Sequence, residues 1–299
     1  MYKHFVNWAK RLNNYFCIFA TYSEHRISIL SIKQEYSPLP MQTPHLAQFT
    51  EIWPQEVPGC TQPKDSPVVN PETGHIVKVT NPTLEEFRPS GPSDLRCAII
   101  VCPGGAYQKL AYQHEGVQIA RWLSAQGYTA YVLSYRVPDQ REGALQDIFR
   151  AIRLVRHKGF ARVAVIGFSA GANLCCQASA RWKQTLYPPM DCADGQSQRP
   201  DLALLIYPAY LNEGPSNSLS PEITVGAHTP PLFVFGTQDD KRYSCPSCLS
   251  LLQAVHQLEI PLEMHFLPRG GHGYGMQGDG AGRIWPGLAM DWLSRVGQF

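Results

Sequence analysis

The stretch VAVIGFSAGANL, residues 163–174, decides the fold. Its first half is an apolar run rich in β-branched residues, which predicts a buried strand, and its second half is rich in small residues and predicts a helix. Between the two halves, Ser169 stands in a turn flanked by Gly167 and Gly171. A strand, a glycine-flanked serine and a helix in this order predict a nucleophile elbow, in which the serine hydroxyl is exposed at the carboxyl end of a sheet. The helix starting near Ala170 would also point the positive end of its dipole towards negative charge at that site.

Strands and helices alternate along the chain on both sides of this stretch. The strands are continuous apolar runs, and Leu145, Ile148, Ile152 and Val155 between two of them follow helical spacing. This alternation predicts a mostly parallel central sheet with helices on both faces. The predicted strands are residues 97–102, 128–135, 162–167, 202–208, 231–236 and 261–268, with 75–80 and 84–89 expected as antiparallel edge strands.

We expect the 299 residues to form two parts. Residues 1–48 show neither a clean helical nor a clean strand period, which predicts a poorly defined N-terminal extension. Residues 49–299 contain all the predicted strands. A segment of this length is typical of a single large α/β domain.

A serine hydroxyl is a weak nucleophile unless a base removes its proton. His272 lies in RGGHGYG, directly after the last predicted strand, where glycines allow a loop to fold back over the sheet edge. His265 falls inside that strand and His256 inside a predicted helix, where packing or surface roles are more common. We therefore predict His272 as the base.

An acid is needed to orient the imidazole. Asp239 and Asp240 follow the predicted strand 231–236, a position from which a carboxylate reaches the histidine loop. Adjacent side chains point apart, so we expect one to orient His272 and the other to cap the helix that begins near Ser244. We assign the orienting role to Asp239 and keep Asp240 as the alternative.

A glycine-rich turn, VCPGGAYQ, follows the first long strand. Acyl transfer places negative charge on a carbonyl oxygen, and preorganised backbone N–H groups stabilise it. The N–H groups of Gly105, Ala106 and Ala170 are the predicted donors. A dinucleotide-binding loop would need the pattern G-x-G-x-x-G, which is missing here.

Eight landmarks occur in a characteristic order between about residues 52 and 297: CPGGAY, HEG, YR, LQDIFRAIRLVR, GFSAGANL, YP, DD and PRGGHGYG. Together they resemble the bacterial acetyl esterase and xylan esterase-like α/β-hydrolases, the BD-FAE-like group. The resemblance implies an α/β-hydrolase fold with Ser169, Asp239 and His272 as triad. It also implies a serine esterase for short acyl groups, often acetyl groups on carbohydrates, that uses no metal or other cofactor.

The sequence departs from this family at three places. Ala106 and Ala172 stand where the family more often has glycine, and KRYSCP, residues 241–246, replaces a Val-Val-Pro-like turn after the acid. The third departure changes the loop that follows the acid, and with it the expected geometry of that loop and a substrate contact there. Only about 20 residues, 208–229, separate two strands where a lid domain could be inserted, so we expect an open acyl site.

Composition narrows the partners. The 26 Lys and Arg residues against 24 Asp and Glu give a net charge of +2 without a basic cluster, which argues against nucleic acid. Nine cysteines, an odd number with Cys175 and Cys176 adjacent, favour reduced thiols over a disulfide framework. We therefore expect a cytoplasmic location, with secretion as the alternative, because the apolar run 15–20 is short for a signal peptide. No apolar run is long enough to predict a transmembrane helix, so we expect no membrane partner. The predicted triad and the resemblance imply a small ester substrate as partner, and the oligomeric state is left open.

Other motifs leave alternatives. Cys245 and Cys248 form a C-x-x-C, but no second pair exists, so we expect no metal site. Glu115 and Arg136 are expected to form an ion pair beneath the glycine-rich turn.

Two alternative functions remain open at this point. The protein could be a serine peptidase of related fold or a non-catalytic ligand-binding α/β-hydrolase.

Overall fold

The computed structural model describes residues 22–23, 26–27, 49–91, 95–256, 258, 260–278 and 280–296. The chain divides into two units, Met1–Leu46 and Ala47–Phe299. The described residues of the first unit are a short antiparallel pair, β1 (Tyr22–Ser23) and β2 (Arg26–Ile27). The rest of the predicted extension, residues 1–48, lies outside the described residues, and its boundary stays a prediction.

The second unit is built on an eight-stranded sheet with the strand order β10-β9-β8-β7-β5-β6-β4-β3. Strand β4 pairs antiparallel with β3 and β6, and all other neighbours are parallel. The parallel strands other than β10 read as continuous apolar runs because helices bury both of their faces. Strand β10, at the end of the sheet, is only partly buried and contains polar residues. The strands are β3 (Phe49–Glu51), β4 (Thr83–Phe87), β5 (Cys97–Cys102), β6 (Thr129–Ser134), β7 (Arg162–Phe168), β8 (Leu202–Ile206), β9 (Leu232–Thr237) and β10 (Leu262–Leu267).

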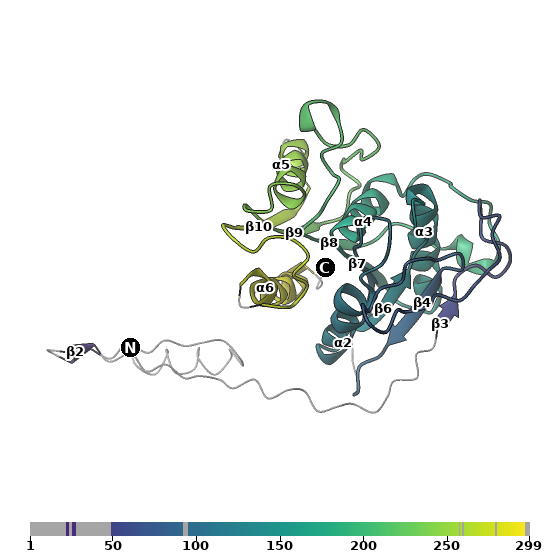
Figure 1. Ribbon diagram of the computed structural model, residues 1–299, viewed down its shortest axis with the longest axis horizontal. Coiled ribbons are helices and arrows are strands. Elements are labelled where there is room, and N and C mark those ends of the chain that lie inside the picture. The colour runs from purple at the N-terminus through teal and green to yellow at the C-terminus, as the bar shows by residue number, and fades with distance from the viewer. Residues whose placement is uncertain are drawn as a thin grey trace. The chain divides into compact units, whose positions relative to one another are not determined.

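Helices cover both faces of the sheet (Figure 1). Helices α3, α4 and α5 lie on one face, and α2 and α6 lie on the other. Trp122 of α2 and Trp285 of α6 meet edge to face, with ring centroids 5.3 Å apart. This layered arrangement confirms the predicted α/β-hydrolase fold. The helices are α2 (Gln118–Ala125), α3 (Arg141–His157), α4 (Ala170–Arg181), α5 (Ser244–Val255) and α6 (Ala281–Val296), with short turns η1 (Tyr112–Val117), η2 (Cys192–Gly195) and η3 (Pro215–Asn217).

One predicted edge strand is wrong. Residues 75–80 make only isolated bridges, in which Ile76 pairs with Val69 and Leu110 while Val79 pairs with Val137. Because the backbone of this segment pairs with three different parts of the chain and not along one neighbouring strand, no continuous ladder of hydrogen bonds forms. The second predicted strand, 84–89, is present as the antiparallel strand β4, but it is not at the edge, because β3 pairs along its outer side.

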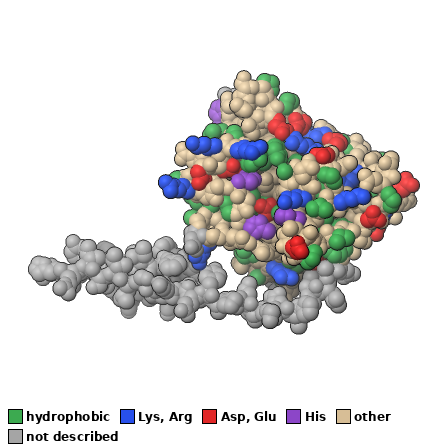
Figure 2. Space-filling model, viewed as in Figure 1, with side chains coloured by type: hydrophobic (Ala, Val, Ile, Leu, Met, Phe, Trp, Pro, Cys, Tyr) green, Lys and Arg blue, Asp and Glu red, His purple; other side chains and the backbone are tan. Residues whose placement is uncertain are grey.

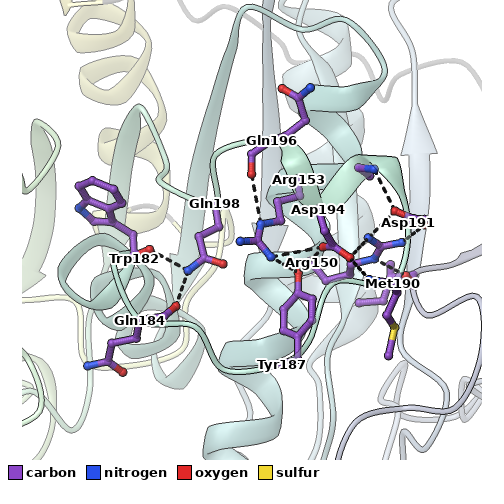
Figure 3. A network of polar contacts seen from close by, with 12 residues as sticks. Arg150, Arg153, Trp182, Gln184, Tyr187, Met190, Asp191, Asp194, Gln196 and Gln198 are labelled. Atoms are coloured by element: carbon purple, nitrogen blue, oxygen red, sulfur yellow. Dashed lines mark hydrogen bonds and ion pairs between the residues drawn. The ribbon is translucent and has the colours of Figure 1, made fainter.

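The connection from α4 to β8 is fastened to α3 by arginines (Figure 3). The Nη1 atom of Arg150 lies 2.9 Å from Oδ2 of Asp194, and the same guanidinium also pairs with Asp191. Arg153 donates to the Tyr187 hydroxyl at 2.9 Å, and that hydroxyl donates to Asp194 at 2.9 Å. Each buried charge therefore has a partner, as a buried arginine requires.

The surface of the described domain carries mixed charges. Figure 2 shows Lys and Arg side chains scattered among acidic and apolar ones on one face.

Within the described part of the chain, no helix is both long enough and apolar enough to cross a membrane.

The beginning of α4 approaches the end of β5 so closely that side chains are excluded. A Cβ on Gly171 would lie 2.0 Å from the Cys102 carbonyl oxygen, and one on Gly167 would lie 2.2 Å from the Gly171 carbonyl oxygen. Real Cβ atoms do not approach backbone oxygens this closely, so glycine is required at both positions.

We predict that Gly171→Ala destabilises the domain by about 3 kcal/mol or more, because the backbone of β5 cannot move away from the added methyl group. Gly195→Ala is the matched control, since a Cβ there meets no atom within 4 Å. Urea unfolding of both variants measures the effect. A Gly171→Ala midpoint equal to that of Gly195→Ala would contradict the close packing.

Candidate active site

Ser169 occupies the predicted elbow between β7 and α4. Its backbone has φ 52° and ψ −117°, a conformation that costs free energy in any residue other than glycine. Two backbone hydrogen bonds hold the turn, from Ser169 N to the Ile206 carbonyl at 3.1 Å and from Ala209 N to the Ser169 carbonyl at 3.2 Å. The strained turn leaves the side chain half-buried at the carboxyl end of the sheet.

His272 lies beside the serine, as the sequence predicts. Its Nε2 is 2.7 Å from Ser169 Oγ. Two aromatic rings contact the imidazole, that of Tyr207 at 5.2 Å and that of Tyr243 at 4.9 Å between centroids. The hydrogen bond places a proton acceptor at the hydroxyl, which is the geometry that activates a serine.

The acid at His272 is Asp240, so the assignment of Asp239 is wrong in this structure. Asp240 Oδ2 lies 2.5 Å from His272 Nδ1. The same carboxylate is buried and accepts backbone N–H groups of Tyr243 at 3.3 Å and Ser244 at 3.0 Å. One residue thus orients the imidazole and also holds the start of α5, two roles that the sequence analysis divided between neighbours.

Asp239 points the other way and binds the histidine loop. Its exposed carboxylate accepts the N–H groups of Gly271 at 2.9 Å and Gly270 at 3.1 Å. These hydrogen bonds lower the pKa of Asp239 from its ordinary value. Asp239 therefore acts on His272 through the loop backbone and not through the imidazole.

The glycine-rich turn passes next to the nucleophile. A Cβ on Gly104 would lie 2.9 Å from the Ser169 Cβ. Gly105 and Ala106 have φ values of 132° and 60°, and the Gly105 carbonyl accepts Gln108 N and Lys109 N. Within the described residues, no acceptor bonds the N–H groups of Gly105, Ala106 or Ala170. These predicted donors are therefore available to an oxyanion, and their role stays a prediction.

A buried glutamate connects this turn to the histidine loop. Glu115, from η1, accepts Gly104 N at 2.7 Å and the Tyr207 hydroxyl at 2.7 Å. The Tyr207 hydroxyl in turn accepts Gly275 N at 2.9 Å. Burial raises the pKa of Glu115, while its two hydrogen bonds act in the opposite direction. The carboxylate fixes both loops at once.

The expected ion pair between Glu115 and Arg136 is wrong. Arg136 bonds Asp147 instead, with a guanidinium nitrogen 2.9 Å from the carboxylate, and both side chains are buried. Asp147 also accepts the Trp53 indole N–H at 2.8 Å. The arginine therefore fixes α3 to the segment before β4 and does not touch the candidate site.

The C-x-x-C gives no sign of metal binding. Cys245 and Cys248 are free, and burial raises the pKa of Cys248 to about 12, which disfavours the thiolate that metals need. In the described part of the chain, no three His, Cys, Asp or Glu side chains are grouped closely enough to hold a metal ion. A metal-free site stays a prediction.

The sheet, the elbow and the Ser169–His272–Asp240 geometry together define an α/β-hydrolase. No protein-family profile matches the chain. The crystal structure of an acetyl ester-xyloside bifunctional hydrolase from Caldicellulosiruptor lactoaceticus is 28% identical, with a TM-score of 0.68, covering 84% of this chain and 97% of that one.

Two curated proteins are also similar. The acetylxylan esterase of Xylanibacter ruminicola is 26% identical over 63% of this chain, and endo-1,4-beta-xylanase B of Butyrivibrio fibrisolvens is 28% identical over 64%. The match spans only 43% and 34% of the length of these relatives. The chain has the α/β-hydrolase fold and is similar to acetyl and xylan esterases, which confirms the resemblance seen in its motifs.

The two aspartates allow a direct test. Because Asp240 contacts the imidazole, we predict that Asp240→Asn slows labelling of Ser169 by a fluorophosphonate about 10⁴-fold, the scale of losing the orienting acid of a triad. Asp239→Asn, which keeps one acceptor for the loop, should slow it less than about tenfold. The labelling rate of each variant is measured by intact-protein mass spectrometry. A larger decrease in this rate for Asp239→Asn than for Asp240→Asn would reverse the assignment.

Proposed function

We propose that the protein is a serine carboxylic ester hydrolase that acts on short acyl esters through an acyl-serine intermediate. The observation that carries this proposal is the continuous line of hydrogen bonds from Ser169 Oγ to His272 Nε2 and from His272 Nδ1 to Asp240. Nothing in that line requires a further group, so the chemistry uses protein side chains alone.

The reaction follows from this geometry. His272 takes the proton of Ser169 while Oγ forms a bond to the ester carbonyl carbon. The imidazolium, stabilised by Asp240, then gives that proton to the departing alcohol oxygen as the ester C–O bond breaks. In the second half, the same imidazole takes a proton from a water whose oxygen attacks the acyl carbon, and it returns that proton to Ser169 Oγ as the acyl C–Oγ bond breaks and the acid leaves. The N–H groups of Gly105, Ala106 and Ala170 stabilise the negative oxygen in both halves.

We infer that the substrates are acetyl or similar short acyl esters of carbohydrates. The support is the likeness to an acetylxylan esterase and to an acetyl ester-xyloside hydrolase, together with the short connection between β8 and β9. A cytoplasmic location stays a prediction.

Removing the nucleophile tests the proposal. Ser169→Ala should lower turnover of p-nitrophenyl acetate by about 10⁶, because nucleophile and base act as a unit. Ser179→Ala is the control and should stay active, because Ser179 is a buried serine nearly three turns along α4 whose hydroxyl donates to the Cys175 carbonyl. Both proteins are compared after circular dichroism confirms folding. Ser169→Ala protein that keeps more than about a hundredth of the activity would refute the mechanism.

Acyl length is a second test. A long acyl chain gains binding free energy only where apolar surface encloses it, about 0.8 kcal/mol for each buried CH₂. The 25 residues between β8 and β9 include only one short turn, η3, and form no lid helix. We predict that kcat/KM for p-nitrophenyl esters is highest between acetyl and butyryl and falls by octanoyl. A maximum at eight carbons or more would contradict the short-acyl assignment.

A further inference from the structure

A row of aromatic rings extends from the base of the candidate triad. Tyr243 contacts the His272 imidazole, and the ring of Tyr210 lies 6.0 Å from that of Tyr243. The Arg141 guanidinium stacks 4.9 Å from the Tyr210 ring and 5.2 Å from the Tyr107 ring. We call Tyr243, Tyr210, Arg141 and Tyr107 the aromatic row. It begins at the base and ends at the residue that follows Ala106.

The row comes from four separate segments, three loops and the start of α3, that follow strands of the sheet. Tyr107 follows β5, Arg141 begins α3 after β6, Tyr210 follows β8, and Tyr243 follows β9. The carboxyl ends of the strands form the edge where α/β sheets bind ligands. A shared edge explains why residues far apart in sequence meet around one serine.

Each member is held in place. The Tyr107 hydroxyl donates to buried Asn173 at 2.8 Å, and Asn173 donates to the Tyr210 carbonyl at 3.1 Å. Tyr243 N donates to Asp240 at 3.3 Å. Asn173 thus holds the Tyr107 side chain and the Tyr210 backbone, and Asp240, which also contacts His272, holds the Tyr243 backbone.

The accessible part of the row combines flat faces with polar groups. Tyr210 and Tyr243 are half-buried, so part of each ring meets solvent. Arg141 forms a two-pronged pair with Glu213, at 2.6 and 3.1 Å, with 42% of each side chain exposed. The opposite charges cancel, yet both groups retain exposed donor or acceptor atoms. Such a surface suits an uncharged ring with hydroxyl groups on its rim and C–H groups on its faces, which is the chemistry of a neutral pyranose.

The chemistry of the base decides which part of the ester meets the row. His272 must hand its proton to the departing alcohol oxygen, so the alcohol lies on the His272 side of the bond that breaks. Tyr243 is the ring of the row that contacts His272. We propose that the aromatic row binds the sugar ring of the leaving alcohol, with Tyr243 and Tyr210 as stacking faces and the Arg141–Glu213 pair as hydroxyl contacts. This inference rests on the proposed ester hydrolase function.

The test compares a sugar ester with an ester that carries no sugar. For each protein, kcat/KM is measured on acetylated xylotriose, by acetate release, and on p-nitrophenyl acetate, and the ratio of the two is taken. Tyr243→Ala and Tyr210→Ala should each lower this ratio about tenfold, as loss of an aromatic anchor does in a binding site. Tyr243→Phe keeps the ring and should restore most of the ratio.

Trp182→Ala is the matched control. Trp182 is also an aromatic residue with a guanidinium near its ring, that of Arg199 at 6.0 Å. It follows α4 at the end away from Ser169, about 18 Å along a 12-residue helix. Its activity and its ratio should match the wild type. If the alanine variants fold poorly, a second measurement gives the same answer. Unacetylated xylotriose should competitively inhibit hydrolysis of p-nitrophenyl acetate by the wild type, and this inhibition should be weaker in Tyr243→Leu.

The outcomes separate the two proposals. Wild-type protein that cleaves p-nitrophenyl acetate, with ratios equal within about twofold in Tyr243→Ala, Tyr210→Ala and Trp182→Ala, would overturn the sugar-binding row and leave the esterase proposal standing. Wild-type protein that cleaves no ester would overturn both. A lowered ratio in the two tyrosine variants alone is the result we expect.

Discussion

The contact between Gly171 and the Cys102 carbonyl is the constraint on which the rest of the site depends. Because no Cβ stands between them, α4 begins directly against the end of β5. The chain can leave β7 and enter α4 within this space only if Ser169 adopts a positive φ. That turn presents the hydroxyl to His272 at the N-terminal end of α4. Packing between a helix and a strand thereby determines where the chemistry takes place.

Carboxylates hold the loops around this elbow, each in a different way. Asp240 bonds the imidazole and the start of α5, whereas Asp239 bonds the backbone of the histidine loop. Glu115 bonds Gly104 on one side and, through Tyr207, Gly275 on the other. Charged acceptors form stronger hydrogen bonds than neutral ones, which suits loops that lack regular structure of their own. The proposed nucleophile, base and oxyanion donors are thus fixed before substrate arrives, and preorganisation of this kind is what makes electrostatic stabilisation effective.

The sequence allowed the fold and most of the site to be predicted, because strand–turn–helix patterns and glycine spacing are local properties. Ser169 and His272 were found from such patterns, and the structure brings them together. The choice between Asp239 and Asp240 depends on how the chain turns after β9, which neither residue's identity reveals. The partner of Arg136 was predicted wrongly as well, because only the fold shows that Asp147 of α3, and not Glu115, lies against its guanidinium. The aromatic row was missed because its four members come from four separate segments and share no spacing in the sequence.

The most direct test of the account is to map the covalent adduct formed with paraoxon, a phosphate triester that reacts with activated serines. Ser169 Oγ would displace p-nitrophenolate from phosphorus and keep the diethylphosphoryl group. After complete inactivation, peptide mass spectrometry should find one adduct per chain, on Ser169, and His272→Ala protein should remain almost unmodified over the same time. An inactivated protein whose adduct lies on another residue, or an active esterase that never modifies Ser169, would contradict the central claim.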